Sequence, residues 1–191
     1  DDEITIANKI FQSNIRTLEN TSQILDSNSF KKAVKLILNA NRVELYGVGG
    51  SSVIAMDAFH KFIRTGIKAN SYTDSHFQLM SASQLSKDDL AIVISHSGSN
   101  KDILRILQVL NETGAKTIGI TGFPKSTLSQ NVDVSLYTSS EETEYRPEAL
   151  ASRIAQLSII DALYVNIMIL NSHKAKASFE KVRTAISETR S

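Results

Sequence analysis

The chain has 191 residues, of which 41% are apolar and 21% are charged, with 21 basic and 20 acidic side chains. At roughly 150 residues per domain, this length and apolar content predict one folded domain with a substantial core rather than a disordered chain. A formal net charge of +1 argues against DNA binding by this piece alone, because phosphate contacts need clustered basic charge. The absence of cysteine excludes disulfides, thiolate metal sites and cysteine nucleophiles.

The N-terminus shows neither the basic segment nor the apolar segment of a leader peptide. The missing initiator Met indicates an upstream segment that has been cut away, and a cytoplasmic fragment is the simplest interpretation. The apolar stretch 154–170 falls short of the about 20 residues that span a bilayer, and Asp161 near its middle would cost about 2.5 to 3.5 kcal/mol there. We therefore expect a buried helix and no membrane contact.

The first predicted element is an amphipathic helix of about 24 residues. Its apolar residues recur every seven positions, at Ile4, Phe11, Leu18 and Leu25. A second helix is expected to begin at about Ser29, with this serine as its N-cap. The predicted organisation is an N-terminal amphipathic helix, residues 1–28, followed by residues 29–191 as the body of a single domain.

Five short apolar runs then alternate with helical patterns. The third run, Leu90 to Ile94, does not alternate with polar residues, as expected for a central parallel strand covered on both faces. The alternation predicts an α/β fold, with a five-stranded parallel sheet in a doubly wound α/β/α sandwich and right-handed crossovers. Two helices, at about 148–171 and 173–189, should close the chain. The five expected strands are 43–48, 67–73, 90–95, 116–121 and 132–137.

The loop after the first strand, residues 47–52, is the first candidate binding site. Ligands of open α/β sheets bind beyond the carboxyl ends of the strands. The glycines of the loop let backbone amides approach an anion closely. The following helix, expected over 53–65, adds partial positive charge at its N-terminus, and Ser51 and Ser52 add hydroxyl donors. The alternatives are a purely structural turn and a dinucleotide site, although Ser52 occupies the third glycine position of the dinucleotide motif.

The loop after the third strand, residues 95–100, is the second candidate site. Ser95, Ser97 and Ser99 alternate around Gly98, just before a predicted helix at 101–111. This arrangement forms a nest of donors sized for one phosphate. No Gly-Lys-Ser/Thr follows, which excludes a P-loop and favours a phosphomonoester. The alternative interpretation is a serine-rich helix cap.

These loops resemble the sugar isomerase (SIS) phosphosugar-binding domain over residues 30 to 170. The motifs that carry the resemblance are Gly47-x-Gly49-x-Ser51, Ser95-x-Ser97-Gly98-Ser99 and Gly119-Ile120-Thr121. More narrowly, four segments look like the effector domain of RpiR/MurR-type transcriptional regulators: Asp57-x-x-x-Lys61-x-x-Arg64-x-Gly66, Thr73-Asp74-Ser75-His76, Glu142-Thr143-Glu144-Tyr145-Arg146 and Ser152-Arg153-Ile154-Ala155-Gln156. Such regulators carry an N-terminal helix-turn-helix domain that is not visible here. The resemblance therefore implies contact with DNA only through that absent half.

The resemblance implies ligand contacts at particular positions. Six of these positions lie in the two loops. The phosphate is expected to bind Ser95, Ser97 and Ser99, and Asn100 is expected to cap the helix that follows them. Ser51 and Ser52 are expected to contact the sugar or its phosphate. His76 is similar to a sugar-contacting position, the alternative being an ordinary surface or core histidine. Glu142 and Arg146 fall where the family closes the pocket, the alternative being a surface ion pair. His96 stands at a variable position and is interpreted as a bystander.

Three functions remain open. The first is a sensor, in which a phosphosugar binds the loops, orders residues 140–150 and shifts a homodimer or tetramer between two states. The second is an aldose–ketose sugar-phosphate isomerase, for which Glu148 is the only carboxylate near the expected position and no convincing acid–base pair is present. The third is a module for another anion such as a nucleotide. We favour the sensor, without cofactor or metal, and residues 142–146 resemble the branch that senses amino-sugar phosphates such as N-acetylmannosamine 6-phosphate.

Overall fold

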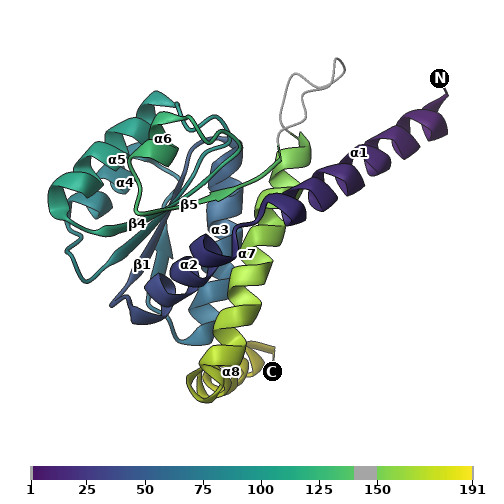
Figure 1. Ribbon diagram of the computed structural model, residues 1–191. Helices are drawn as coiled ribbons and strands as arrows, with labels where there is room; N and C mark the ends of the chain where they lie inside the picture. Colours follow the sequence, from purple (N-terminus) through teal and green to yellow (C-terminus); the bar gives the residue numbers. More distant parts are fainter. Residues whose placement is uncertain (1, 140–149, 191) are drawn as a thin grey trace.

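The computed structural model describes residues 2–139 and 150–190 (Figure 1). Helices and strands alternate through the middle of the chain, and helices occupy both ends. The elements in chain order are α1 (Glu3–Ile24), α2 (Ser27–Asn39), β1 (Val43–Gly47), α3 (Gly50–Phe62), the 3-10 turn η1 (Ile63–Thr65), β2 (Ala69–Ser71), α4 (Ser75–Ser83), β3 (Leu90–Ile94), α5 (Lys101–Thr113), β4 (Lys116–Thr121), α6 (Thr127–Gln130), β5 (Val134–Tyr137), α7 (Leu150–Leu170), α8 (Ser172–Ser187) and the 3-10 turn η2 (Glu188–Arg190).

The strands form one parallel sheet in the order β2-β1-β3-β4-β5. β1 and β3 are central and pair along their whole lengths, from Val43 beside Leu90 to Gly47 beside Ile94. All five predicted strands are confirmed. The second is shorter than predicted, because edge strand β2 pairs only with the first three residues of β1.

Helices cover both faces of the sheet, which confirms the predicted doubly wound sandwich (Figure 1). Alternate residues of β3 enter two separate cores. Leu90, Ile92 and Ile94 pack with α2, α3 and α7, whereas Ala91 and Val93 pack with α4, α5 and α6. Since both faces are covered, every side chain of β3 is buried, as the unbroken apolar run predicted.

The structure corrects the start of the second helix. Asp26, not Ser29, is the N-cap of α2, and its Oδ2 accepts a hydrogen bond from the Ser29 backbone N–H at 2.7 Å. An acidic N-cap also suits the positive end of the helix dipole. Ser29 therefore lies inside the first turn.

Helix α1 turns its polar side toward the domain. Its buried residues are Ser13, Thr17 and Thr21, while Phe11 of the predicted apolar stripe is 68% exposed. The Thr21 hydroxyl accepts a hydrogen bond from the Ser139 backbone N–H at 3.0 Å. The helix is amphipathic as predicted, but much of its apolar stripe faces away from this domain.

Helix α7 is long and apolar enough to cross a membrane by length and composition, yet one side of it packs against α1, α2 and α3. Its buried residues include Ile159, Ile160, Leu163 and Ile167, which join the core that covers one face. Across its exposed side, the ammonium of Lys61 on α3 bonds to the carboxylate of Asp161. The predicted helix is therefore present, but it is buried on one side only, and Val165, Ile169 and Leu170 are exposed.

Candidate functional site

The glycine loop (residues 47–52) and the serine loop (residues 95–100) follow two neighbouring strands, β1 and β3. Gly47 pairs with Ile94, so the two loops leave the sheet at the same level. Adjacent strands lie about 4.8 Å apart. The structure thus brings the two predicted loops together at the carboxyl edge of the sheet, where ligands of such folds bind.

The glycine loop folds tightly back into α3. A Cβ on Gly47 would lie 2.3 Å from the Ser51 carbonyl oxygen, so this close approach requires glycine. Gly49, the N-cap of α3, has φ +58°, which also favours glycine. Helix α3 begins at Gly50, three residues earlier than predicted, and both serines lie in its first turn. The Ser52 hydroxyl donates to the Gly49 carbonyl oxygen at 2.6 Å.

The serine loop is held by its own hydroxyls. Ser95 is 5% exposed, and its Oγ accepts a hydrogen bond from the Gly98 backbone N–H at 3.1 Å. A serine hydroxyl also has one proton to donate, which this bond leaves available. The hydroxyl of Ser97 accepts from the Ser99 backbone N–H at 3.3 Å. Ser97 and Ser99 are both exposed.

Asn100 caps the helix that follows, as the resemblance implied. Its Oδ1 accepts hydrogen bonds from the backbone N–H groups of Asp102 at 3.0 Å and Ile103 at 3.3 Å. Beside it, Ser97 and Ser99 line a hollow of about 580 Å³ with residues 123–127. Hydroxyls and Lys125 therefore share one surface depression close to the N-terminus of α5, which is an arrangement suited to an anion.

His76 lies at the start of α4, on the loop after β2. Asp74 caps this helix, with Oδ1 accepting from the backbone N–H groups of His76 at 2.9 Å and Phe77 at 3.1 Å. The His76 side chain is 88% exposed, and its Nδ1 lies 3.8 Å from the Asp74 carboxylate. Within this chain His76 is thus a surface residue, and its contact with a sugar stays a prediction.

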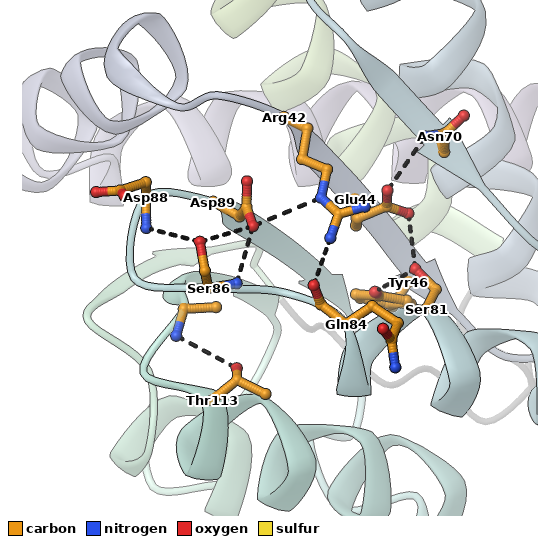
Figure 2. A network of polar contacts seen from close by, with 11 residues as sticks. Arg42, Glu44, Tyr46, Asn70, Ser81, Gln84, Ser86, Asp88, Asp89 and Thr113 are labelled. Atoms are coloured by element: carbon orange, nitrogen blue, oxygen red, sulfur yellow. Dashed lines mark hydrogen bonds and ion pairs between the residues drawn. The ribbon is translucent and has the colours of Figure 1, made fainter.

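A buried polar network fixes α4 to the sheet, and the sequence reasoning missed it (Figure 2). Glu44 of β1 is 1% exposed and accepts hydrogen bonds from Asn70 Nδ2 at 3.1 Å and Ser81 Oγ at 2.9 Å. The Tyr46 hydroxyl lies 2.9 Å from the same Ser81 Oγ. Burial raises the pKa of Tyr46 well above its usual range, so the phenol stays neutral.

Gln78, also on α4, holds the glycine loop directly. Its Nε2 donates to the carbonyl oxygens of Gly47 at 2.9 Å and Tyr72 at 2.6 Å. These two residues end β1 and follow β2, so one buried amide connects both strand ends. No short-range sequence signal marks Gln78 or Glu44, because their partners lie on other elements.

The motif Asp57-x-x-x-Lys61-x-x-Arg64-x-Gly66 has a structural role. Lys61 Nζ contacts the carboxylate of Asp57 at 2.6 Å and that of Asp161 on α7. Burial of the ammonium opposes its charge, but the hydrogen bonds that it donates to the two carboxylates raise the pKa of Lys61. The Arg64 guanidinium lies 6.0 Å from the centre of the Phe179 ring on α8. The motif therefore joins α3 to α7 and the following turn η1 to α8.

The remaining predicted residues have different outcomes. Glu142, Arg146 and the alternative catalytic residue Glu148 lie outside the described residues. His96, predicted as a bystander, packs its ring edge-on against Phe123, with ring centres 5.3 Å apart. Within residues 2–139 and 150–190, no three histidine, aspartate or glutamate side chains are placed to hold a metal ion.

Comparison with known proteins identifies the relationships of this fold. The family model of the SIS domain matches residues 36–166. An uncharacterized HTH-type transcriptional regulator of Caldanaerobacter subterraneus subsp. tengcongensis is 41% identical over 86% of this chain and 58% of its own length. The HTH-type transcriptional regulator RpiR of Escherichia coli is 32% identical over 92% of this chain and 60% of its length. The chain thus spans about three fifths of these relatives.

Solved structures agree with the sequence relatives. The Vibrio vulnificus NanR protein complexed with ManNAc-6P superposes with a TM-score of 0.89 at 26% identity, covering 96% of this chain and 69% of that one. A phosphoheptose isomerase from Francisella tularensis has a TM-score of 0.71 at 20% identity, covering 87% of this chain and 98% of that one. At that identity the second likeness shows the fold alone. The fold is therefore shared by regulators and isomerases.

Proposed function

The chain belongs to the SIS domain family and is related to the SIS domains of RpiR-family regulators, and we propose that it is a phosphosugar-sensing effector domain of a bacterial transcriptional regulator of sugar catabolism. The observation that carries the proposal is the pairing of two anion-suited loops on β1 and β3, at one edge of the sheet. The DNA-binding half lies in the part of the regulator that this chain does not span. The location of the whole protein is the cytoplasm, where an operator is accessible.

The phosphate of the ligand binds the serine loop. Ser97 and Ser99 present exposed hydroxyls, Ser95 retains a proton to donate, and α5 directs its N-terminus at the same place. Each hydrogen bond to a charged phosphate oxygen contributes about 1.5 to 3 kcal/mol. Ser51 and Ser52 then face the sugar from the neighbouring loop, and His76, Glu142 and Arg146 complete the site.

The ligand class is an amino-sugar phosphate. V. vulnificus NanR, the relative with a TM-score of 0.89, is complexed with ManNAc-6P. Residues 142–146 also resemble the branch that senses such sugars. N-acetylmannosamine 6-phosphate is therefore the first compound to test.

Phosphorus NMR with hexose, pentose and amino-sugar monophosphates, followed over hours, tests the proposal. A ligand signal that shifts or broadens without new peaks supports a sensor. A new phosphate-ester peak that grows with time would replace the sensor by the second candidate, a sugar-phosphate isomerase, an enzyme class in which this fold also occurs. No response to any compound would contradict both.

The sensor acts as a homo-oligomer, in which a second copy covers the apolar stripe of α1. Ile4, Phe11 and Ile15 are exposed on this helix, whereas its side toward the domain carries Ser13, Thr17 and Thr21. Exposed apolar residues in a row on one helix face are typical of a helix that packs against a partner. Ligand binding then shifts the population between two arrangements of the copies.

A further inference from the structure

Arg153, in the first turn of α7, lies directly over the first residue of α3. A Cβ on Gly50 would lie 2.5 Å from a terminal nitrogen of Arg153 and 2.9 Å from its central guanidinium carbon. The guanidinium therefore occupies the space that any other side chain at Gly50 would fill. Helix α7 thus places a permanent positive charge on the glycine loop.

The Arg153 side chain is exposed and lies where a second positive group is already present, so the position attracts an anion. The N-terminus of α3 already carries partial positive charge. The first turn of α3 contains no acidic residue, and Gly49 as N-cap supplies no side-chain acceptor. Among the residues that the structure describes, none forms an ion pair with Arg153. Two positive groups face each other at the edge where the ligand is proposed to bind.

A second, buried donor lies one turn further along the same helix. Gln156 is 1% exposed, and within the described part of the chain its Nε2 has no acceptor. Residues three apart on a helix are neighbours on its surface. Arg153 is exposed and Gln156 is buried, so an exposed and a buried donor lie one turn apart on α7. A buried donor without an acceptor is costly.

We propose that Arg153 binds the phosphate of the ligand from the side opposite the serine loop. This inference rests on the proposed function, since it concerns the same site. The hydroxyls and the amide of the serine loop are neutral, and Lys125 lines the hollow beside them. Arg153 therefore adds a further positive charge, which favours a phosphate dianion over a neutral sugar. A guanidinium suits this role because its planar fork matches two phosphate oxygens.

The test measures binding of ManNAc-6P and of inorganic phosphate by calorimetry to wild type, Arg153→Gln and Arg153→Lys. Arg183→Gln is the matched control, because it removes the same charge from an exposed position on α8. Loss of a charge-assisted bond predicts roughly 10- to 150-fold weaker binding for Arg153→Gln. We expect partial recovery with Arg153→Lys and a change of less than about twofold for the control.

Thermal unfolding without ligand separates ligand binding from packing. Because Arg153 opposes the dipole of α3, Arg153→Gln should have the same Tm as wild type or a higher one. Wild-type affinity in Arg153→Gln would overturn the inference and leave the proposed function intact. A lower Tm for Arg153→Gln, together with weak binding that Arg153→Lys does not recover, would also overturn it, by showing a packing role. Failure of the wild-type protein to bind any sugar phosphate would refute the proposed function and the inference together.

Discussion

Ser81 is expected to be critical for stability, because its hydroxyl joins a buried carboxylate to a buried phenol (Figure 2). It donates to Glu44 Oε2 at 2.9 Å and lies 2.9 Å from the hydroxyl oxygen of Tyr46. A serine has a single hydroxyl proton, and Ser81 donates it in the hydrogen bond to the Glu44 carboxylate. The Tyr46 hydroxyl must therefore donate to Ser81. Ser81→Ala therefore breaks two hydrogen bonds at once.

The expected loss follows from the two groups left behind. A hydrogen bond to a charged group contributes about 1.5 to 3 kcal/mol, and a buried hydroxyl without a partner costs about 1 to 3 kcal/mol. Ser81→Ala should therefore lower the free energy of unfolding by about 2.5 to 6 kcal/mol. This is a large part of the about 5 to 15 kcal/mol that stabilises a typical domain.

Urea unfolding followed by circular dichroism measures this loss. Ser83→Ala is the matched control, because Ser83 lies exposed on the same helix and its hydroxyl donates to Met80 O. We expect a change within about 0.5 kcal/mol for the control. Adding Tyr46→Phe to Ser81→Ala should recover part of the loss, since it removes the unpaired phenol. Wild-type stability of Ser81→Ala would refute the assignment of these hydrogen bonds.

Three further predictions follow from other contacts. Asn100→Ala should lower the free energy of unfolding by about 1 kcal/mol through loss of the α5 cap; an unchanged Tm would contradict this. Because the pKa of Lys61 is raised above 10.5, its stabilising effect is complete below that pH and is lost as pH rises through the folded-state pKa. The stability difference between wild type and Lys61→Met should therefore shrink in alkali, and a constant difference would argue against the ion pair. Phe11→Ser should dissociate the proposed oligomer in sedimentation experiments, and a wild-type monomer at micromolar concentration would refute that oligomer.

The sheet and the two loops could be predicted from the sequence because their signals are local. Leu90 to Ile94 is an unbroken apolar run between turn residues, which is typical of a strand buried on both faces. Gly49 and Gly98 have φ of +58° and +62°, conformations in which glycine is favoured, so the turns could be placed as well. Loops after adjacent parallel strands then share one edge.

The remaining features depend on contacts between distant parts of the chain. Glu44 looks like an ordinary strand residue until Asn70 and Ser81 are brought to it. The stripe of α1 gave the correct helix but not the side that packs, because Thr17 and Thr21 rather than the apolar residues face the domain. Arg153 was noted within a motif, but only the packing of α7 on α3 places it over Gly50.

The most direct test of the central claim compares the affinity of wild type and Ser97→Ala for ManNAc-6P and for N-acetylmannosamine itself. The account predicts that wild type binds the phosphorylated sugar much more tightly than the free sugar. It also predicts that Ser97→Ala weakens binding of the phosphorylated sugar by roughly 10- to 150-fold while keeping the wild-type Tm. Equal affinity of wild type and Ser97→Ala for the phosphorylated sugar would contradict the assignment of the serine loop as the phosphate site.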